Sequence, residues 1–358
     1  LESTRIAKEK LATHILGASE KLDLLHWMDA AGSFTSPCLA VGNARLATTM
    51  QPLPTTRMYS GRARAFLKVQ DGCDSFCSYC IVPYTRGKSR SLASQHVRSQ
   101  LDRYLDYGYQ EVVFTGIHLG QWGRDLDPPQ DLAALLKFLA RGPLPARIRL
   151  SSLESVEWSD DLLYYLSSNA SICPHFHVPL QSGSSEVLKA MRRPYTPRQY
   201  IELILEINRK FPRAGVGADV MVGFPGETDR HFQETVELID RLPLTYLHVF
   251  PFSPRPGTYA AELSGRVTGS TLKQRAKFLR NLDTNKRMEF RQSNIGQTAE
   301  VLVETEIDSG VWRGTSDNYL QVMFHSTNHS VLPGSLVKVR LKKLHRTGIV
   351  SGEPLSTP

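Results

Sequence analysis

The sequence of 358 residues has no long apolar run and few cysteines. Because no stretch of eighteen or more consecutive apolar residues is present, the sequence predicts no membrane-spanning helix. The first residues, LESTRIAKEKLATHILG, lack the apolar core of a secretory signal peptide. Of the five cysteines, three fall within eight residues, whereas a small secreted disulfide protein would spread an even number along its chain. We therefore predict a cytoplasmic protein with no membrane partner.

The sequence also has no large excess of one charge sign. Lys and Arg total 43 against 35 Asp and Glu, which gives a formal net charge of +8. This excess permits a polyanionic partner such as RNA, but a basic surface without such a partner explains it equally well. The hydrophobic fraction of 41% is typical of a globular protein, and the length indicates two or three domains.

The middle of the chain alternates between candidate strands and candidate helices. Strands are predicted at 65–69, 111–117, 146–153, 175–180, 215–225 and 246–253. Helices are predicted at 92–107, 131–140, 160–168, 186–191, 197–211 and 229–242. This alternation indicates parallel βα units. We expect an α/β fold, a curved and open (partial) parallel β/α barrel, with its chemistry at the carboxyl ends of the strands.

Segments of different character flank this unit. Residues 8–16 and 20–28 carry apolar residues at helical spacing, and residues 48–60 are typical of a polar linker that contains proline. Residues 271–292 predict a basic helix, whose charged side is either solvated or in contact with RNA. After residue 295 strands dominate, which predicts a small all-β barrel.

Cys73, Cys77 and Cys80 form a CxxxCxxC motif directly after a predicted strand. Three thiolates on one loop can hold three of the irons of a [4Fe–4S] cluster. The fourth iron then has no protein ligand, and a substrate or cofactor can bind there. A structural zinc site is the alternative, but such sites usually use four ligands in paired CxxC form, and no second pair lies nearby. The motif in this setting indicates one [4Fe–4S] cluster with an open iron site.

The motif resembles that of the radical S-adenosylmethionine (SAM) superfamily, with Tyr79 at the aromatic position before the last cysteine. The resemblance implies that SAM binds the open iron. It also implies that an electron donor of the flavodoxin or ferredoxin type reduces the cluster. A 5′-deoxyadenosyl radical then forms and takes a hydrogen atom from the substrate. No acid–base pair is required of the protein, which supplies orientation and excludes water.

Longer blocks resemble the methylthiotransferases, which add sulfur and a methyl group to tRNA adenosines or to a ribosomal-protein aspartate. The match runs from Ala65 to Pro254 and includes the blocks GCDSFCSYCIVPYTRGKSRS, HVPLQSGSSEVLKAMRRPYT, DVMVGFPGET and HVFPFSPRPGT. Residues 62–292 are then the radical SAM domain, and residues 293–358 are similar to the RNA-binding TRAM barrel. The segment TGIHLG at 115–120 is similar to the branch that acts on N6-threonylcarbamoyladenosine at position 37 of tRNA, the MtaB type. The resemblance implies tRNA as partner, a sulfur donor and a second SAM as methyl donor.

The resemblance also implies site residues. SAM would be held near the following residues: Tyr79, Thr115, Gly116, Ser152, Glu154, Gln181, Asp219, Gly223 and Phe224. The substrate RNA would be contacted by Arg86, His118, Arg192 and Arg193. Each has a plainer alternative, namely core packing for Phe224, a structural histidine for His118, and a solvated surface position for Glu154 and for the arginines.

The chain departs from this family at its beginning. Methylthiotransferases carry an N-terminal domain with three cysteines that hold a second [4Fe–4S] cluster, implicated in sulfur delivery. Residues 14–28 resemble the end of that domain, and Cys38 stands alone, so the ligands of a second cluster are absent. We expect residues 1–61 to be a remnant of that domain and a linker, either because the chain is a fragment or because the protein lacks this cluster. Cys173 is expected to be a small buried residue.

Three functions remain open from the sequence. The first is methylthiolation of N6-threonylcarbamoyladenosine in tRNA. The second is the same reaction on isopentenyladenosine tRNA or on a ribosomal-protein aspartate. The third is an inactive RNA-binding protein with a structural metal, which the SAM-side motifs disfavour because a structural site needs no open iron.

Overall fold

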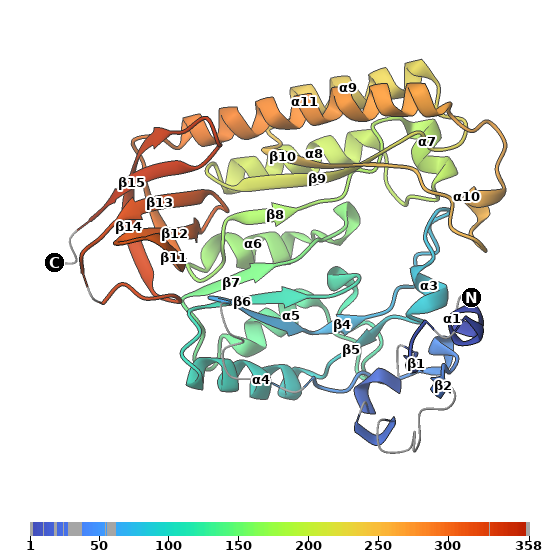
Figure 1. Ribbon diagram of the computed structural model, residues 1–358, viewed down its shortest axis with the longest axis horizontal. Coiled ribbons are helices and arrows are strands. Elements are labelled where there is room, and N and C mark those ends of the chain that lie inside the picture. Colours follow the sequence, from blue (N-terminus) through green and yellow to red (C-terminus); the bar gives the residue numbers. More distant parts are fainter. Residues whose placement is uncertain are drawn as a thin grey trace.

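The computed structural model describes residues 3–9, 11–17, 20–23, 25–27, 38–53, 55, 62–328 and 330–355. Figure 1 shows a β/α unit in the middle, a small barrel at one end, and the N-terminal segments at the opposite end. No helix of the described residues is long and apolar enough to cross a membrane.

Six parallel strands form the central unit. They are β3 (Ala65–Lys68), β6 (Glu111–Thr115), β7 (Arg147–Leu150), β8 (His175–His177), β9 (Gly215–Val222) and β10 (Tyr246–Pro251). The first three pair in the order β3-β6-β7 and the last three in the order β8-β9-β10. A parallel bridge between Ile148 and Ile172 joins the two halves, and β3 and β10 do not pair with each other. The prediction of an open, partial β/α barrel is therefore confirmed.

The helices that cover this barrel begin and end close to the predicted positions. They are α4 (Ser94–Asp106), α5 (Leu132–Leu139), α6 (Asp160–Ser168), α7 (Ser185–Ala190), α8 (Pro197–Lys210) and α9 (Asp229–Arg241). Thr196 and Thr228 cap α8 and α9 in reciprocal capping boxes, which fixes where both helices begin. Each helix places an apolar stripe on the strands, with Leu101, Leu136 and Ile204 fully buried in one continuous core.

The predicted basic helix is α11 (Gly269–Ser293), which runs alongside the strands toward the small barrel (Figure 1). Part of its basic charge is used internally. Arg275 is buried and pairs with Glu227 at 2.5 Å, and buried Lys286 donates to the main-chain oxygen of Leu242 at 2.9 Å. Lys273, Lys277 and Arg280 stay exposed.

Five strands close the C-terminal barrel in the order β11-β12-β13-β15-β14. They are β11 (Thr298–Asp308), β12 (Val311–Ser316), β13 (Gln321–His325), β14 (Leu336–Leu344) and β15 (Val350–Pro354). The sequence predicted the all-β class but gave no sign of β12. Without β12 the sheet between β11 and β13 would stay open, so this strand completes the barrel.

The small barrel packs against the amino ends of the parallel strands, opposite the cysteine loop (Figure 1). Arg147 and Arg149 of β7 reach across and donate to the main-chain oxygens of Thr315 and Ser316, at 3.3 and 3.2 Å. The Tyr319 ring stacks on the ring of buried His175 with centroids 4.1 Å apart. The small barrel therefore closes the bottom of the β/α barrel.

The N-terminal segments differ from the prediction. The helical spacing at 8–16 does not lead to a helix there. The helix α1 (Ser3–Lys8) ends at the start of this segment, and His14–Leu16 form β1, which pairs in parallel with β2 (Cys38–Ala40). Glu20–Asp23 form a short 3-10 helix, η1. Residues 48–53 and 55 have no regular structure, and the rest of the expected linker lies outside the described residues.

Candidate iron–sulfur site

The three cysteines lie on residues 72–81, here called the cysteine loop. It follows the short strand β4 (Gln70–Asp71), which pairs with β5 (Arg90–Ser91). Gly72 has a φ of 77°, and a Cβ atom there would lie 1.9 Å from the main-chain oxygen of Lys88. Only glycine fits this turn, and it directs the chain from β4 into the loop.

Two further elements hold the far side of the cysteine loop. The Ser78 N–H donates to the main-chain oxygen of Met191 at the end of α7, at 3.0 Å. The Ser78 oxygen accepts from the N–H of Ala260 in α10 (Tyr259–Glu262), at 2.8 Å. After the loop, α3 (Val82–Thr85) leads the chain back toward β5. Because several elements fix it, the cysteine loop is a preorganised site.

The three thiols of the cysteine loop are free and half-buried. Burial raises the pKa of the Cys77 thiol, and burial together with the charges of its two neighbouring cysteines raises the pKa of Cys80. Burial also acts to raise the pKa of Cys73, but hydrogen bonds from His118 and from the Ser75 N–H outweigh it, so this pKa is lowered. Three free thiols that influence one another on one loop form a donor set that fits the three-thiolate ligation of a [4Fe–4S] cluster.

Arg193 and Glu154, which were predicted for different ligands, meet beside Cys77. The Arg193 side chain is buried, donates from Nη1 to the Cys77 sulfur at 3.2 Å, and forms an ion pair with Glu154. The Arg193 guanidinium also lies 5.0 Å from the ring centroid of Tyr195, whose hydroxyl donates to the main-chain oxygen of Leu180 at 2.8 Å. Arg193 is therefore a neighbour of the cysteine loop and is shielded from the surface.

His118 is buried beside Cys73, with its Nδ1 atom 3.3 Å from the cysteine sulfur. On its other side, Nε2 lies 2.5 Å from a carboxylate oxygen of Glu157. Burial lowers the pKa of His118, but its contacts with Cys73 and Glu157 outweigh burial and raise this pKa to about 10. Sequence reasoning missed Glu157, because no motif marks it.

Several buried polar atoms without a hydrogen-bond partner in the described structure gather around the cysteine loop and the carboxyl ends of the strands. They include Ser78 Oγ, Ser151 Oγ, Ser155 Oγ, Gln181 Oε1 and Ser184 Oγ, together with His118 Nε2 and Glu157 Oε1, which contact each other without a regular hydrogen bond. Buried polar groups are nearly always paired in native proteins, so such a group of orphaned atoms fits a site for a polar ligand. Gln181 was predicted, whereas the predicted Ser152 is exposed and its neighbour Ser151 carries the orphaned hydroxyl.

Three other predicted SAM neighbours pack against protein. A Cβ atom on Gly116 would lie 2.9 Å from Gln70 Oε1, and one on Gly223 would lie 2.2 Å from Leu272. Phe224 is fully buried in a cluster with Tyr79 and other apolar side chains. Thr115 is half-buried at the end of β6.

Asp219 lies with two histidines on β8 and β10. Its carboxylate oxygen is 2.9 Å from His177 Nε2 and 3.2 Å from His248 Nδ1. Burial acts to raise the pKa of Asp219, but these two contacts hold it well below its usual range. The ligand atoms of the three residues lie within 4.8 Å of one another.

The remaining predicted RNA contacts differ in exposure. Arg86 forms an ion pair with Asp71 at 2.9 Å and is partly buried. Arg192 is exposed, and its guanidinium lies 4.6 Å from the ring centroid of exposed Tyr259. Of the predicted arginines, Arg192 is the one freely presented to solvent beside the cysteine loop.

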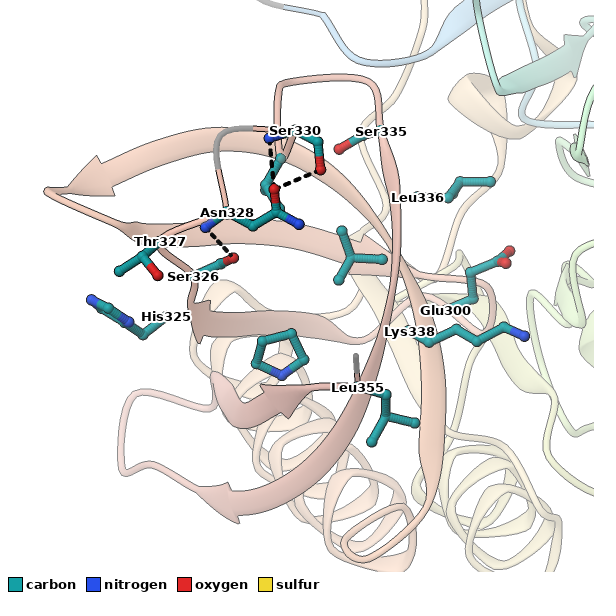
Figure 2. Close-up of a pocket in the computed structure, with 13 residues that line it drawn as sticks. Glu300, His325, Ser326, Thr327, Asn328, Ser330, Ser335, Leu336, Lys338 and Leu355 are labelled. Atoms are coloured by element: carbon teal, nitrogen blue, oxygen red, sulfur yellow. Dashed lines mark hydrogen bonds between the residues drawn. The ribbon is translucent and has the colours of Figure 1, made fainter. Parts of the chain in front are cut away.

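A cavity of about 700 Å³ lies in the small barrel, away from the cysteine loop. Figure 2 shows that it is lined by polar residues of β13 and of the segment that follows, including His325, Asn328 and Ser330, and by Lys338 of β14. Its position separates it from the cysteine chemistry.

Comparison with known proteins places this site in a class. Residues 67–239 match the family model described as the Radical SAM superfamily, which implies a [4Fe–4S] cluster and SAM as cofactors. The threonylcarbamoyladenosine tRNA methylthiotransferase MtaB of Aquifex aeolicus is 36% identical over 88% of this chain and 75% of its own length. The MtaB protein of Bacillus subtilis is 33% identical over 92% of this chain and 73% of its own length. The tRNA-2-methylthio-N(6)-dimethylallyladenosine synthase of Pelotomaculum thermopropionicum is 36% identical over 80% of this chain and 65% of its own length.

The chain therefore belongs to the radical SAM methylthiotransferase family, of the MtaB type. Among solved structures, the radical SAM methyltransferase TsrM of Kitasatospora setae is similar with a TM-score of 0.48 and 17% identity. The match covers 55% of this chain and 38% of the TsrM chain.

Proposed function

We propose that this protein adds a methylthio group to C2 of N6-threonylcarbamoyladenosine at position 37 of tRNA. One SAM supplies the radical and a second SAM supplies the methyl group. The observation that carries this proposal is the preorganised three-thiol loop, with orphaned polar atoms beside it, in a chain similar to the MtaB proteins. The segment TGIHLG at 115–120 supports the choice of substrate within the family.

The chain's own residues have distinct parts in this proposal. When bound, the cluster and SAM together supply a 5′-deoxyadenosyl radical. Cys73, Cys77 and Cys80 would hold the cluster, and Gln181 with the buried serines would hold the polar groups of SAM. Glu154 and Arg193 carry opposite charges beside Cys77, where the charged ends of SAM would come closest to the cysteine loop.

Water exclusion is the other task of the protein in radical chemistry. Met191, Met221, Phe224 and Ala260 form a buried apolar cluster behind Tyr79 of the cysteine loop. This cluster closes the site from the side of α7 and α10, so access remains from the mouth of the β/α barrel.

The tRNA partner is supported by exposed positive charge. On β14, Lys338, Arg340 and Lys342 are exposed and alternate with buried Val339 and Leu341. Such a row on a small barrel suits contact with RNA phosphates, and we propose that the barrel has the TRAM-like role predicted for residues 293–358. Because this barrel lies at the end opposite the cysteine loop, tRNA bound to both must extend along the side of the molecule (Figure 1). We further propose a flavodoxin-type or ferredoxin-type electron donor and a separate sulfur donor.

Nucleoside mass spectrometry tests the proposal. Anaerobically reconstituted protein is incubated with SAM, sulfide, a reductant and tRNA that carries threonylcarbamoyladenosine. In a parallel reaction the tRNA carries dimethylallyladenosine, because the chain is also similar to a synthase acting on that nucleoside. We expect a methylthio product from the first tRNA alone. A product from the second tRNA alone would replace the proposed substrate, and 5′-deoxyadenosine without either product would refute sulfur insertion by this chain under these conditions.

A further inference from the structure

We propose that His118 and Glu157 form a positioning pair that donates a hydrogen bond to the sulfur of Cys73 and thereby sets the reduction potential of the cluster. The inference rests on the proposed role of the cysteine loop in holding that cluster. It assigns His118 a part that differs from substrate contact.

The His118 ring lies between the Glu157 carboxylate and the sulfur of Cys73. Nε2 of His118 lies 2.5 Å from Glu157, and Nδ1 lies 3.3 Å from the Cys73 sulfur. Only 8% of the His118 side chain and 1% of the Glu157 side chain are exposed, so neither is presented to an RNA surface. The hydroxyl oxygen of Ser75 also lies 3.3 Å from Nδ1, so the thiolate and this hydroxyl share the ring nitrogen. An iron-bound thiolate has no hydrogen to donate, so the hydrogen in the contact with Cys73 comes from the imidazole.

Neighbouring groups fix the position of the pair. The main-chain N–H of His118 donates to Oε1 of buried Gln70 at 2.7 Å, and Gln70 Nε2 donates to the main-chain oxygen of Gly72 at 2.8 Å. Gln70 thus ties His118 to the first turn of the cysteine loop. Glu157 Oε2 accepts from the Glu154 N–H at 3.0 Å.

The chain also leaves space for Glu157. A Cβ atom on Gly120 would lie 2.1 Å from Glu157 Oε2, so a residue with a side chain at this position would displace the carboxylate. A buried charged pair is costly unless its partners are well placed. Here the carboxylate has the imidazole on one oxygen and a main-chain N–H on the other.

A hydrogen bond to a cluster thiolate changes the reduction potential in a known direction. A hydrogen bond donated to a cluster thiolate withdraws electron density from the sulfur and stabilises the more negative, reduced cluster. Cys77 has a comparable neighbour in Arg193, but Arg193 also meets Glu154. The contact at Cys73 can therefore be changed without removing the ion pair between Arg193 and Glu154.

The test is a redox titration of the reconstituted protein, followed by electron paramagnetic resonance, with iron content measured on the same samples. His118→Leu removes the donor, His118→Asn keeps an N–H near the Nδ1 position, and Glu157→Gln removes the charge behind the ring. We expect His118→Leu to retain its iron and to shift the midpoint potential to more negative values. His118→Asn should reverse most of this shift. Glu157→Gln weakens the donor but also removes a negative charge near the cluster, so its shift should be smaller than that of His118→Leu. His96→Leu, at an exposed position on α4, is the matched control and should leave the potential unchanged.

The outcomes separate this inference from the proposed function. An unchanged midpoint potential in iron-loaded His118→Leu refutes the proposal that the pair sets the potential. An equal shift in His118→Leu and His118→Asn refutes it as well. If His118→Leu fails to take up iron, an unchanged potential in Glu157→Gln overturns it instead. Failure of the wild-type protein to take up iron would refute the cluster assignment itself.

Discussion

Arg149 of the β/α barrel donates from Nη1 to the main-chain oxygen of Asp317 in the small barrel, at 3.0 Å. Behind it, fully buried Glu111 accepts from Arg149 at 2.9 Å and lies 3.3 Å from Arg147. Glu111 is thus a buried anion shared by two arginines that both reach into the small barrel, where Arg147 also pairs with Glu300 at 3.3 Å. The two barrels share this buried charge network, so the small barrel contributes to the stability of the radical SAM unit.

The first prediction concerns Glu111. Glu111→Gln keeps the shape of the side chain but leaves Arg149 without its buried counter-charge, whereas Arg147 keeps its contact with Glu300. Removing one partner of a buried pair costs about 3–5 kcal/mol, so we expect the free energy of unfolding to fall by that order. Denaturant unfolding measures it. Glu202→Gln, which removes the exposed partner of Arg198 on α8, should leave stability nearly unchanged. Equal effects of the two variants would contradict the shared network.

The second prediction is the pH dependence of that effect. Burial acts to raise the pKa of Glu111, but Arg149 and the neighbouring arginines outweigh it and the folded-state pKa is lowered. A lowered pKa contributes stability that is present above the unfolded-state pKa, about 4.3 for Glu, and is lost as the pH falls through the folded-state value. The difference in the free energy of unfolding between wild type and Glu111→Gln should therefore be constant near neutral pH and become smaller below about pH 4. A difference that widens on acidification would contradict it.

The third prediction concerns the cysteines. Cys73→Ala, Cys77→Ala and Cys80→Ala should each lose most of the bound iron and abolish 5′-deoxyadenosine formation, because each removes one of three ligands. Cys38→Ala is the control, since Cys38 lies on β2 and outside the cysteine loop, and it should retain both. Iron analysis and chromatography of the nucleoside measure the outcome. Full deoxyadenosine formation in a cysteine-loop variant would exclude the cluster assignment.

The barrel and the cysteine motif were predictable because their signals are local. A continuous apolar run marks β6, apolar residues at helical spacing mark α8, and the three cysteines lie within eight residues of sequence. By contrast, β12 contains Gly314, Thr315 and Ser316, which are buried only because neighbouring strands cover them. Its own sequence therefore carries no apolar alternation.

The contacts around the cysteines were not predictable, because they join distant parts of the chain. His118 is 45 residues from Cys73, and Arg193 is 116 residues from Cys77. Arg192 and Arg193 are adjacent in a basic segment, yet Arg192 faces solvent and the Arg193 side chain is buried beside a thiol. Only the fold, which brings the end of α7 against the cysteine loop, distinguishes the two.

The fourth prediction concerns the entry into the cysteine loop. Gly72→Ala would place a methyl group against the main-chain oxygen of Lys88, so the loop must shift and iron uptake should fall sharply. Gly108→Ala is the matched control, because Gly108 has a similar φ of 82° but nothing within 4 Å of the added Cβ atom. Gly108→Ala should lower the free energy of unfolding by about 1 kcal/mol, because of backbone strain alone, and should retain iron uptake. Equal iron content in the two variants would show that the turn does not position the thiols.

The fifth prediction concerns the exposed row on β14. The double variant Lys338→Ala and Arg340→Ala removes two cations whose side chains face away from the barrel core. Contacts with phosphates are independent of sequence and weaken with salt, so tRNA affinity should fall for every tRNA tested. The slope of log affinity against log salt should decrease by about one for each lost contact. Filter binding or fluorescence anisotropy at several salt concentrations measures both quantities. The double variant Arg198→Ala and Arg209→Ala, at two exposed positions on α8, controls for the loss of two positive charges alone. If the β14 variant matches this control in affinity and slope, RNA binds elsewhere, and the exposed cations of α11 become the next surface to change.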